Sequence, residues 1–460
     1  MRIRPPSPRH FIQCYATAYD GDQPCGWRDT VPADHYAGAM RDAVALVIAA
    51  LTIAGVLLRP RGLSEAVFCV AGAAAMVATG IVGPAAAWRS VAEQWDVLLF
   101  LTGLLLVSWG AEQAGVFRWA ALQAAWASRG SGVRLFFNTC LVGIVLTTFF
   151  SLDATALLLT AVLAPLTVEL QLPPLPYALA CAFIANSASL TLPVSNPLNI
   201  LVLGSGGVRL GTYLAHVLLA SALVIATTIA YLWVRYRRAL DRQFDAERLP
   251  HPREAIKDPL LFHTAAATLA LLAIAYVVTA ALGLPLSLPV AVAGGVLLIT
   301  ALAPGRISPR AVAAAPWSIL PFVAGLLIVV RGVETTGLTA QLGQRLLEAA
   351  HHGSGAGVLV ATGISAAGSN LINNLPMGAV MLSALHTVGA QRSPSLLYGT
   401  LLGADVGPNF TVLGALSSML WLLQLRRCGI RATAGDFFRD GAMLTPLLLI
   451  AGMAAIALVA

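Results

Sequence analysis

The chain of 460 residues is 58% hydrophobic and 11% charged, with a mean hydropathy of +0.80. This composition excludes a soluble protein of several domains and indicates a polytopic membrane protein. The net charge of +7 does not indicate nucleic-acid binding, because the basic residues are dispersed among short loops, as in the positive-inside pattern of membrane proteins.

Residues 1–41 form a polar segment with several arginines and prolines but without the apolar core of a signal peptide. We expect this segment to be an irregular tail. Its His10, Cys14, Cys25 and His35 match no common metal-ligand spacing, so neither a metal site nor a cofactor is expected. The sequence contains no CxxC pair and predicts no disulfide framework.

Apolar runs of membrane-spanning character occupy most of the remaining chain. A helix needs roughly 20 such residues to cross a bilayer. Clear runs lie at 43–58, 64–83, 97–111, 212–234, 261–282, 287–303, 318–333 and 440–460. Two longer stretches, 135–203 and 355–425, are apolar but carry polar interruptions. The sequence therefore predicts an all-α polytopic membrane protein.

An internal repeat relates residues 101–115 to residues 323–337. Glycine and glutamate recur at an offset of 222 (325 − 103) in the pairs Gly103 and Gly325, Gly110 and Gly332, Glu112 and Glu334, and Gly115 and Gly337. Within a few residues, the same offset sets Asp153 against Asn374 and Asn186 against Asp405.

The repeat predicts two related transmembrane halves, 42–234 and 261–460, joined by a charged cytoplasmic connector at 235–260. Such duplication is typical of secondary transporters. We expect an inverted repeat, in which the two halves have opposite orientations in the membrane.

Loop charges distinguish two topologies for the stretches 135–168 and 355–389. If each stretch crosses the membrane once, the basic loop residues divide evenly between the two sides. If each is a re-entrant hairpin beside about ten full spans, most basic residues lie on the cytoplasmic side, among them Arg59 and Arg61 of the first loop. We therefore predict two re-entrant hairpins with broken helices.

Four polar clusters should meet near the middle of the membrane: the two hairpin tips and the segments 184–201 and 396–425. Prolines in the latter two segments should break their helices beside polar side chains. Buried asparagines also join helices to one another, but their concentration at helix breaks favours a binding site. The candidate binding residues are Ser151, Asp153, Asn186, Ser195, Asn196, Asn199, Ser369, Asn370, Asn373, Asn374, Asp405 and Asn409.

Asp405 is the one charged residue in the segment 396–425. An aspartate at the centre of a spanning helix costs roughly 2.5 to 3.5 kcal/mol, which makes it a functional hypothesis by default. Pro408 removes an N–H and disfavours helix at Gly407, so the helix should break beside Asp405. Asp153 is the second acid expected near the middle of the membrane. Both are candidate proton carriers; the alternative is that each caps a half-helix or makes a structural pair.

Three segments, FIANSASLTLPVSN (183–196), NNLP (373–376) and GADVGPNFTVLGALSSMLW (403–421), resemble the arsenical pump membrane protein family. These are the arsenite and antimonite efflux carriers of the ion transporter superfamily. The resemblance runs from about Leu46 to the C-terminus. It implies paired hairpins and export of As(III) and Sb(III) across the bacterial inner membrane in exchange for protons, alone or with a soluble metalloid-stimulated ATPase. A homodimer is a further expectation.

Two positions depart from the family pattern. The family's first tip reads Asn-Asp, whereas Leu152 precedes Asp153 here, and Asn186 stands where the family has an aspartate. The first half therefore keeps fewer polar or acidic groups, which leaves the substrate and the coupling stoichiometry open.

Two other functions compete with arsenite export. The pairs Ser369-Asn370 and Ser195-Asn196 resemble the tips of sodium-coupled carboxylate carriers, so a sodium- or proton-coupled carrier of anions such as dicarboxylates is the alternative. Such a carrier should have more Arg or Lys at its site. An intramembrane aspartyl protease is disfavoured because no GxGD pattern precedes Asp405. The sequence has no GxxxxGK[ST] loop, so transport must be ion-driven or powered by a separate subunit.

Overall fold

The computed structural model describes residues 33–206, 208–282, 284–304, 306–313, 315–391 and 393–459. It divides into two compact units, Met1–Ala43 and Val44–Ala460. Most of the expected tail lies outside the described residues, but the first helix, α2 (Ala33–Leu58), already begins within it. All regular elements of the described residues are helical, which confirms the predicted fold class.

Eight described helices are long and apolar enough to cross a membrane, and a ninth span is added if α16 (Ile319–Glu334) and α17 (Leu338–His351), bent by 81°, count as one. The eight are Gly38–Leu58, Trp95–Gln113, Gly132–Phe149, Leu152–Glu169, Leu210–Leu240, Pro259–Thr279, Ser354–Ile372 and Ala434–Val459. The predicted runs at 64–83 and 287–303 form the shorter helices α3 (Glu65–Ala78) and α14 (Ser287–Leu302).

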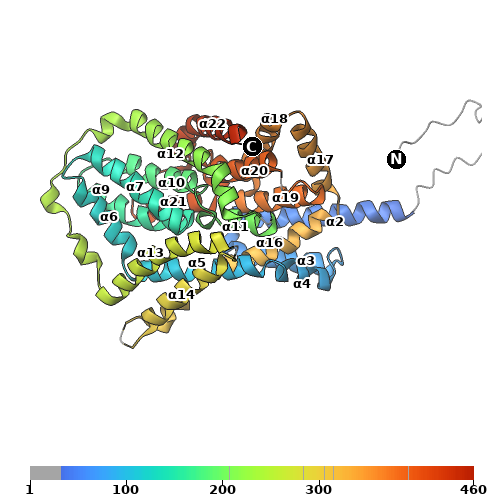
Figure 1. Ribbon diagram of the computed structural model, residues 1–460, viewed down its shortest axis with the longest axis horizontal. Helices are drawn as coiled ribbons and strands as arrows, with labels where there is room; N and C mark the ends of the chain where they lie inside the picture. The colour runs from blue at the N-terminus through green and yellow to red at the C-terminus, as the bar shows by residue number, and fades with distance from the viewer. Residues whose placement is uncertain are drawn as a thin grey trace, which may run out of the picture. The chain divides into compact units, whose positions relative to one another are not determined.

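The other elements follow in chain order (Figure 1). In the first half they are α4 (Pro84–Ala92), α5 (Trp95–Gln113), α6 (Val116–Ala127), α7 (Gly132–Phe149), α8 (Leu152–Ala154), η2 (Thr155–Leu159), α9 (Thr160–Glu169), α10 (Pro174–Ala188), η3 (Pro193–Ser195), α11 (Pro197–Gly206) and α12 (Leu210–Leu240). In the second half they are α13 (Pro259–Leu282), α15 (Pro309–Ala313), α18 (Ser354–Ile372), α19 (Asn374–Thr387), α20 (Pro394–Val406), η6 (Gly407–Asn409), η7 (Val412–Gly414), α21 (Leu416–Arg427) and α22 (Ala434–Val459). The connector carries the short turns η4 (Ala246–Arg248) and η5 (Pro252–Ala255).

Helices of the second half begin at nearly constant distances after those of the first. α17, α18 and α19 begin 222 residues after α6, α7 and α8 (338 − 116, 354 − 132, 374 − 152). Around the helix breaks the distance is 219, because η7 follows η3 and α21 follows α11 by that number (412 − 193, 416 − 197). Residues of the two halves can therefore be paired by position.

Glycines of the repeat lie where helices from different halves touch. α5 packs on α14, and a Cβ at Gly103 would lie 2.7 Å from the backbone nitrogen of Ala291. α16 packs on α3, and a Cβ at Gly325 would lie 2.7 Å from the carbonyl carbon of Cys69. Small residues permit such close approach of helices. Each half therefore completes part of its packing with a helix of the other half.

The two predicted hairpin tips are helix breaks. α7 ends at Phe149 and α8 begins at Leu152, while Asn373, with a left-handed φ of 75°, separates α18 from α19. Three of the four limbs have 18 or 19 residues, or about 27 Å at 1.5 Å per residue, and are longer than limbs that reach only mid-bilayer. Within the helical unit, α6 and α9 lie toward one end and α17 and α18 toward the other (Figure 1).

Candidate functional site

The site is built on two broken helices, one from each half. The first breaks after α10, with η3 before α11, and the second breaks after α20, with η6 and η7 before α21. Pro408 lies in η6, three positions after Asp405, so the predicted break beside Asp405 is confirmed. Proline also begins α11, where its missing N–H leaves no helix hydrogen bond unmade.

Asp405 is buried and binds two asparagines of the other broken helix. Its Oδ1 accepts a hydrogen bond from Asn196 Nδ2 at 2.6 Å, and its Oδ2 accepts one from Asn199 Nδ2 at 2.8 Å. Asn199 also donates to the carbonyl of Ser189 at 2.9 Å. Each carboxylate oxygen thus has an amide donor, which stabilises charge in a place without water.

Asn186 occupies the position equivalent to Asp405, 219 residues earlier. Its Nδ2 donates to Asn409 Oδ1 and to Ser418 Oγ, both at 3.1 Å, and its Oδ1 accepts from Ser417 Oγ at 2.9 Å. Ser418 is in turn equivalent to Asn199 (418 − 219). Each break residue therefore reaches across to the first turns of the helix that follows the other break.

The second hairpin is fixed to the broken helix that carries Asp405. Asn370 donates to the carbonyl of Gly407 at 2.9 Å, and its Oδ1 accepts from the backbone N–H of Thr411 at 3.0 Å. α18 also packs closely on α20, because a Cβ at Gly403 would lie 2.4 Å from the carbonyl oxygen of Thr362. Movement of this hairpin therefore requires movement of α20.

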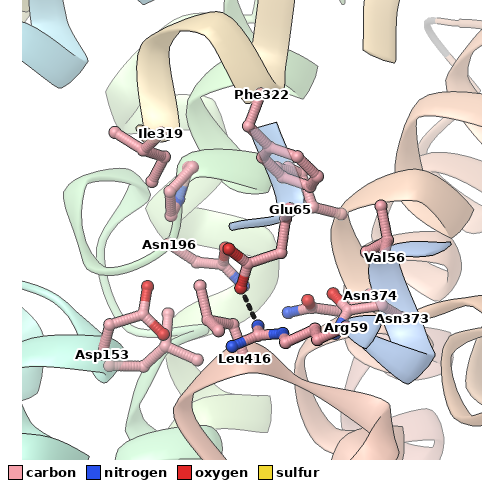
Figure 2. Close-up of a pocket in the computed structure, with 13 residues that line it drawn as sticks. Val56, Arg59, Glu65, Asp153, Asn196, Ile319, Phe322, Asn373, Asn374 and Leu416 are labelled. Atoms are coloured by element: carbon pink, nitrogen blue, oxygen red, sulfur yellow. Dashed lines mark ion pairs between the residues drawn. The ribbon is translucent and has the colours of Figure 1, made fainter. Parts of the chain in front are cut away.

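A small polar chamber of about 30 Å³, room for one or two waters, lies where the tips meet the first broken helix (Figure 2). The predicted residues Asp153, Asn196, Asn373 and Asn374 line it, together with Val56, Arg59, Glu65, Leu152, Pro197, Ile319, Phe322, Leu375 and Leu416. Because Asn196 both lines the chamber and donates to Asp405, the two predicted acids meet at this asparagine.

Arg59 and Glu65 are chamber residues that sequence reasoning missed. The loop-charge count placed Arg59 among cytoplasmic loop residues, and the structure corrects this placement. Arg59 ends α2 in a left-handed conformation, with φ of 43° and ψ of 54°, and its guanidinium forms an ion pair with Glu65 at the start of α3. A loop-charge count treats all loop arginines alike, but an acid and a base at the two ends of one short turn was an available signal.

A larger cavity of about 500 Å³ adjoins the chamber and is mostly apolar. Both are lined by Glu65, Asp153, Pro197, Ile319, Phe322 and Leu416. Ser151 and Glu112 lie in the larger cavity only. A small molecule in this cavity therefore meets Asp153 directly.

A second cavity of about 340 Å³ occupies the position related to the first by the repeat. Its Leu327, Arg331, Glu334 and Ala379 follow Leu105, Trp109, Glu112 and Leu157 of the larger cavity by 222 residues. Its chemistry differs, since Arg89 and Glu93 stand where the larger cavity has Ala311 and Ala315. Among the described residues, it shares none with the chamber.

The remaining candidates bind backbone or one another. Ser195 donates to the carbonyl of Thr148 at 3.2 Å, Ser369 donates to Ser365 within α18 at 2.7 Å, and Ser151 accepts from the N–H of Ala154 at 3.1 Å as an N-cap. Asn186, Asn370 and Asn409 are held by other protein groups. Of the twelve candidates, Asp153, Asn196, Asn373 and Asn374 line the chamber, and Asp405 and Asn199 lie behind Asn196.

The described residues contain no group of three His, Cys, Asp or Glu side chains arranged to hold a metal ion. They also contain no hydrogen bond between the Asp153 and Asp405 carboxyls, which an aspartyl protease pair sharing a proton would need. The chamber is thus a set of amides and carboxylates beside one guanidinium.

The family model described as "Arsenical pump membrane protein" matches residues 44–458. The chain belongs to this family. The arsenical pump membrane protein of Escherichia coli K12 is 31% identical over 419 residues, which are 89% of this chain and 96% of that relative. The arsenical pump membrane protein of Yersinia enterocolitica is 31% identical with the same coverage. Membership of the arsenical pump family makes this chain a multi-pass membrane protein whose relatives are named as pumps.

Among solved structures, the chain resembles the Alcanivorax borkumensis YdaH transporter, reported as having an unusual topology. The TM-score is 0.52 at 16% identity, over 81% of this chain and 86% of that one. At this identity the likeness supports the transporter fold of the arsenical pump family and nothing about the substrate.

Proposed function

We propose that this protein exports arsenite and antimonite from the cytoplasm across the bacterial inner membrane in exchange for protons. The observation that carries the proposal is the chamber in which Asp153 lies beside three asparagines, one of them bonded to Asp405. Arsenous acid is neutral near pH 7, and its hydroxyl groups both donate and accept hydrogen bonds. Amides offer both roles and a carboxylate accepts, so this lining suits such a solute.

Asp153 and Asp405 are the proposed proton carriers. Asp153 faces the open cavity, so it can exchange protons with water there. Asp405 lies behind Asn196, whose amide binds it directly. A proton on Asp405 would remove the acceptor charge that orients Asn196, and through Asn196 it would change the chamber lining. Proton binding and solute binding would then be coupled through one side chain.

The repeat supports an inverted arrangement with access from alternate sides. The two larger cavities occupy equivalent positions in the two halves, yet only the one of about 500 Å³ reaches the chamber. A carrier of this kind would exchange the roles of the two cavities when its halves exchange conformations. The hairpins would then enter from opposite faces, with the limbs of 18 or 19 residues tilted or packed within protein.

A soluble metalloid-stimulated ATPase and a second copy of the chain are proposed partners, and both stand on the sequence resemblance. The proposal requires neither, because a proton gradient is sufficient to drive exchange.

Arg59 gives one reason to keep an anion carrier as the second candidate. A fixed cation in the chamber is the feature that recognition of a carboxylate needs, and the sequence had offered none. Glu65 neutralises this cation in the structure, however, which favours a neutral solute.

Everted membrane vesicles containing the full chain test both functions. We expect uptake of As(III) and Sb(III) driven by a pH gradient, collapse of that uptake with a protonophore, and no uptake of succinate. Sodium-dependent succinate uptake without As(III) transport would establish the anion carrier instead. Uptake that needs ATP and a soluble fraction but survives the protonophore would replace proton exchange by ATPase coupling.

A further inference from the structure

The chamber holds one cation and two acids. Arg59 and Glu65 form an ion pair, and Asp153 lies on the other side of the guanidinium (Figure 2). Within the described part of the chain, no hydrogen bond or ion pair engages the Asp153 carboxyl, although the charge of Arg59 acts on it. The ionisable side chains that line the chamber and the adjoining cavity are Arg59, Glu65, Asp153 and Glu112.

The backbone at Arg59 shows that the side chain is held in place at a cost. Left-handed residues at helix ends are usually glycine, because a side chain there adds roughly 1 to 2 kcal/mol. Here an arginine takes the position, with its N–H bonded to the carbonyl of Gly55 at 3.0 Å. Its buried Nε has no hydrogen-bond partner among the described residues, so the guanidinium retains a donor. An outlier of this kind at a cavity points to function.

Charge balance gives the donor a use. With Asp153 protonated, the chamber is neutral, since Arg59 and Glu65 cancel. With Asp153 ionised and no proton bound, the chamber carries one uncompensated negative charge in a place of low dielectric constant. A neutral solute cannot compensate it, so the compensation must come from the protein.

We propose that Arg59 is a positioning residue of the transport cycle, whose guanidinium turns from Glu65 toward Asp153 when the chamber is empty and Asp153 has lost its proton. This inference rests on the proposed proton exchange. The movement closes the empty chamber with a neutral, hydrogen-bonded contact and permits the return step of the carrier. When a proton and solute arrive, Arg59 goes back to Glu65.

The first test separates two transport modes in vesicles with Arg59→Gln, Arg59→Lys and the exposed control Arg345→Gln, whose partner Glu348 lies at 3.4 Å. Exchange of labelled for unlabelled As(III) requires no return of the empty carrier, whereas net uptake does. We expect Arg59→Gln to lose net uptake at least about tenfold and to keep exchange within about twofold, Arg59→Lys to recover part of net uptake, and Arg345→Gln to match the wild type. Equal loss of both modes, or no loss of either, overturns the proposal.

The second test needs no transport and so stands apart from the proposed function. In a chain whose native cysteines are replaced, Asp153→Cys is labelled with an anionic and a cationic methanethiosulfonate of similar size. Adding Arg59→Gln should lower the ratio of anionic to cationic labelling by about tenfold, because one positive charge near the thiol is removed, and Arg345→Gln should not. An unchanged ratio shows that Arg59 does not act on position 153 and overturns the inference. Wild-type vesicles that carry no As(III) while the ratio falls would overturn the proposed function alone.

Discussion

The two broken helices share a backbone plan but differ in charge. After α20 the break residue is Asp405, held by two amides of the first half, and after α10 it is Asn186, held by hydroxyls and an amide of the second half. The equivalents of Asn196 and Asn199 in the second half are Ala415 and Ser418, at the offset of 219. Only one half therefore offers the donors that a buried carboxylate needs. The duplication preserved the contact between halves, while the ability to hold charge resides on one side.

The largest expected effect comes from replacing Asp405 by Asn. The new amide would place its NH2 against an asparagine NH2, so one hydrogen bond is lost, and no titratable group remains. We expect proton-driven As(III) uptake to fall at least about 100-fold, with a loss of roughly 1 to 3 kcal/mol in unfolding free energy. Uptake in vesicles and detergent-extracted yield measure the two effects. Uptake close to that of the wild type would remove Asp405 from the coupling mechanism.

Adding Asn186→Asp to Asp405→Asn asks whether the two break positions are interchangeable. We expect no rescue, because the new carboxylate would meet Asn409 Oδ1 and two hydroxyls rather than two amide donors. The single substitution Asn186→Asp should reduce stability by roughly 1 to 3 kcal/mol. Recovery of proton-driven uptake in the double variant would show that the asymmetry has no functional meaning.

Helix packing beside the breaks provides a third comparison. A Cβ at Gly403 would lie 2.4 Å from a backbone oxygen of α18, whereas a Cβ at Gly143 of α7 would lie 3.1 Å from the Cγ2 of Ile184, a side chain of α10 that can shift. We expect Gly403→Ala to cost roughly 1 to 3 kcal/mol and Gly143→Ala less. Gly363→Ala, in open space on α18, is the matched control and should be neutral or stabilising. Thermal unfolding in detergent measures all three, and equal effects at Gly403 and Gly143 would contradict the comparison.

The smallest effect is expected at the start of the second half, where Asp258 caps α13. The backbone N–H of Leu261 and the Arg306 guanidinium, 2.8 Å away, hold the pKa of the Asp258 carboxyl below its ordinary value. A lowered folded-state pKa adds stability above the unfolded pKa, and this stability disappears as the pH falls through the folded pKa. Asp258→Asn should therefore lower the Tm slightly at pH 7 and not at all under acid conditions. A Tm difference independent of pH would show that the cap acts without its charge.

Local chemistry made the helix breaks predictable from sequence. Proline lacks an N–H wherever it stands, so Pro408 indicated the break beside Asp405 before any contact was known. Polar residues in apolar runs likewise located the two tips. The choice among asparagines was not predictable, because whether an amide lines a chamber, as Asn374 does, or joins two helices, as Asn186 does, depends on contacts with residues more than 200 positions away.

Arg59 shows a different limit. Its position is set by the turn between α2 and α3, and its role depends on Asp153, which no local pattern connects to it. The glycines Gly103 and Gly325 were recognised as repeated, but their reason, close contact with α14 and α3, depends on how the halves pack.

That packing between halves also sets an order in time for the making of this protein. α3 is complete at Ala78, but its partner α16 begins at Ile319, 241 residues later (319 − 78). At roughly 5 to 20 residues per second, the ribosome needs about 10 to 50 s to supply that partner. During this interval the α3 surface around Cys69 faces lipid or an insertion factor in place of Gly325. Final assembly of either half must therefore wait until synthesis of the second half is well advanced.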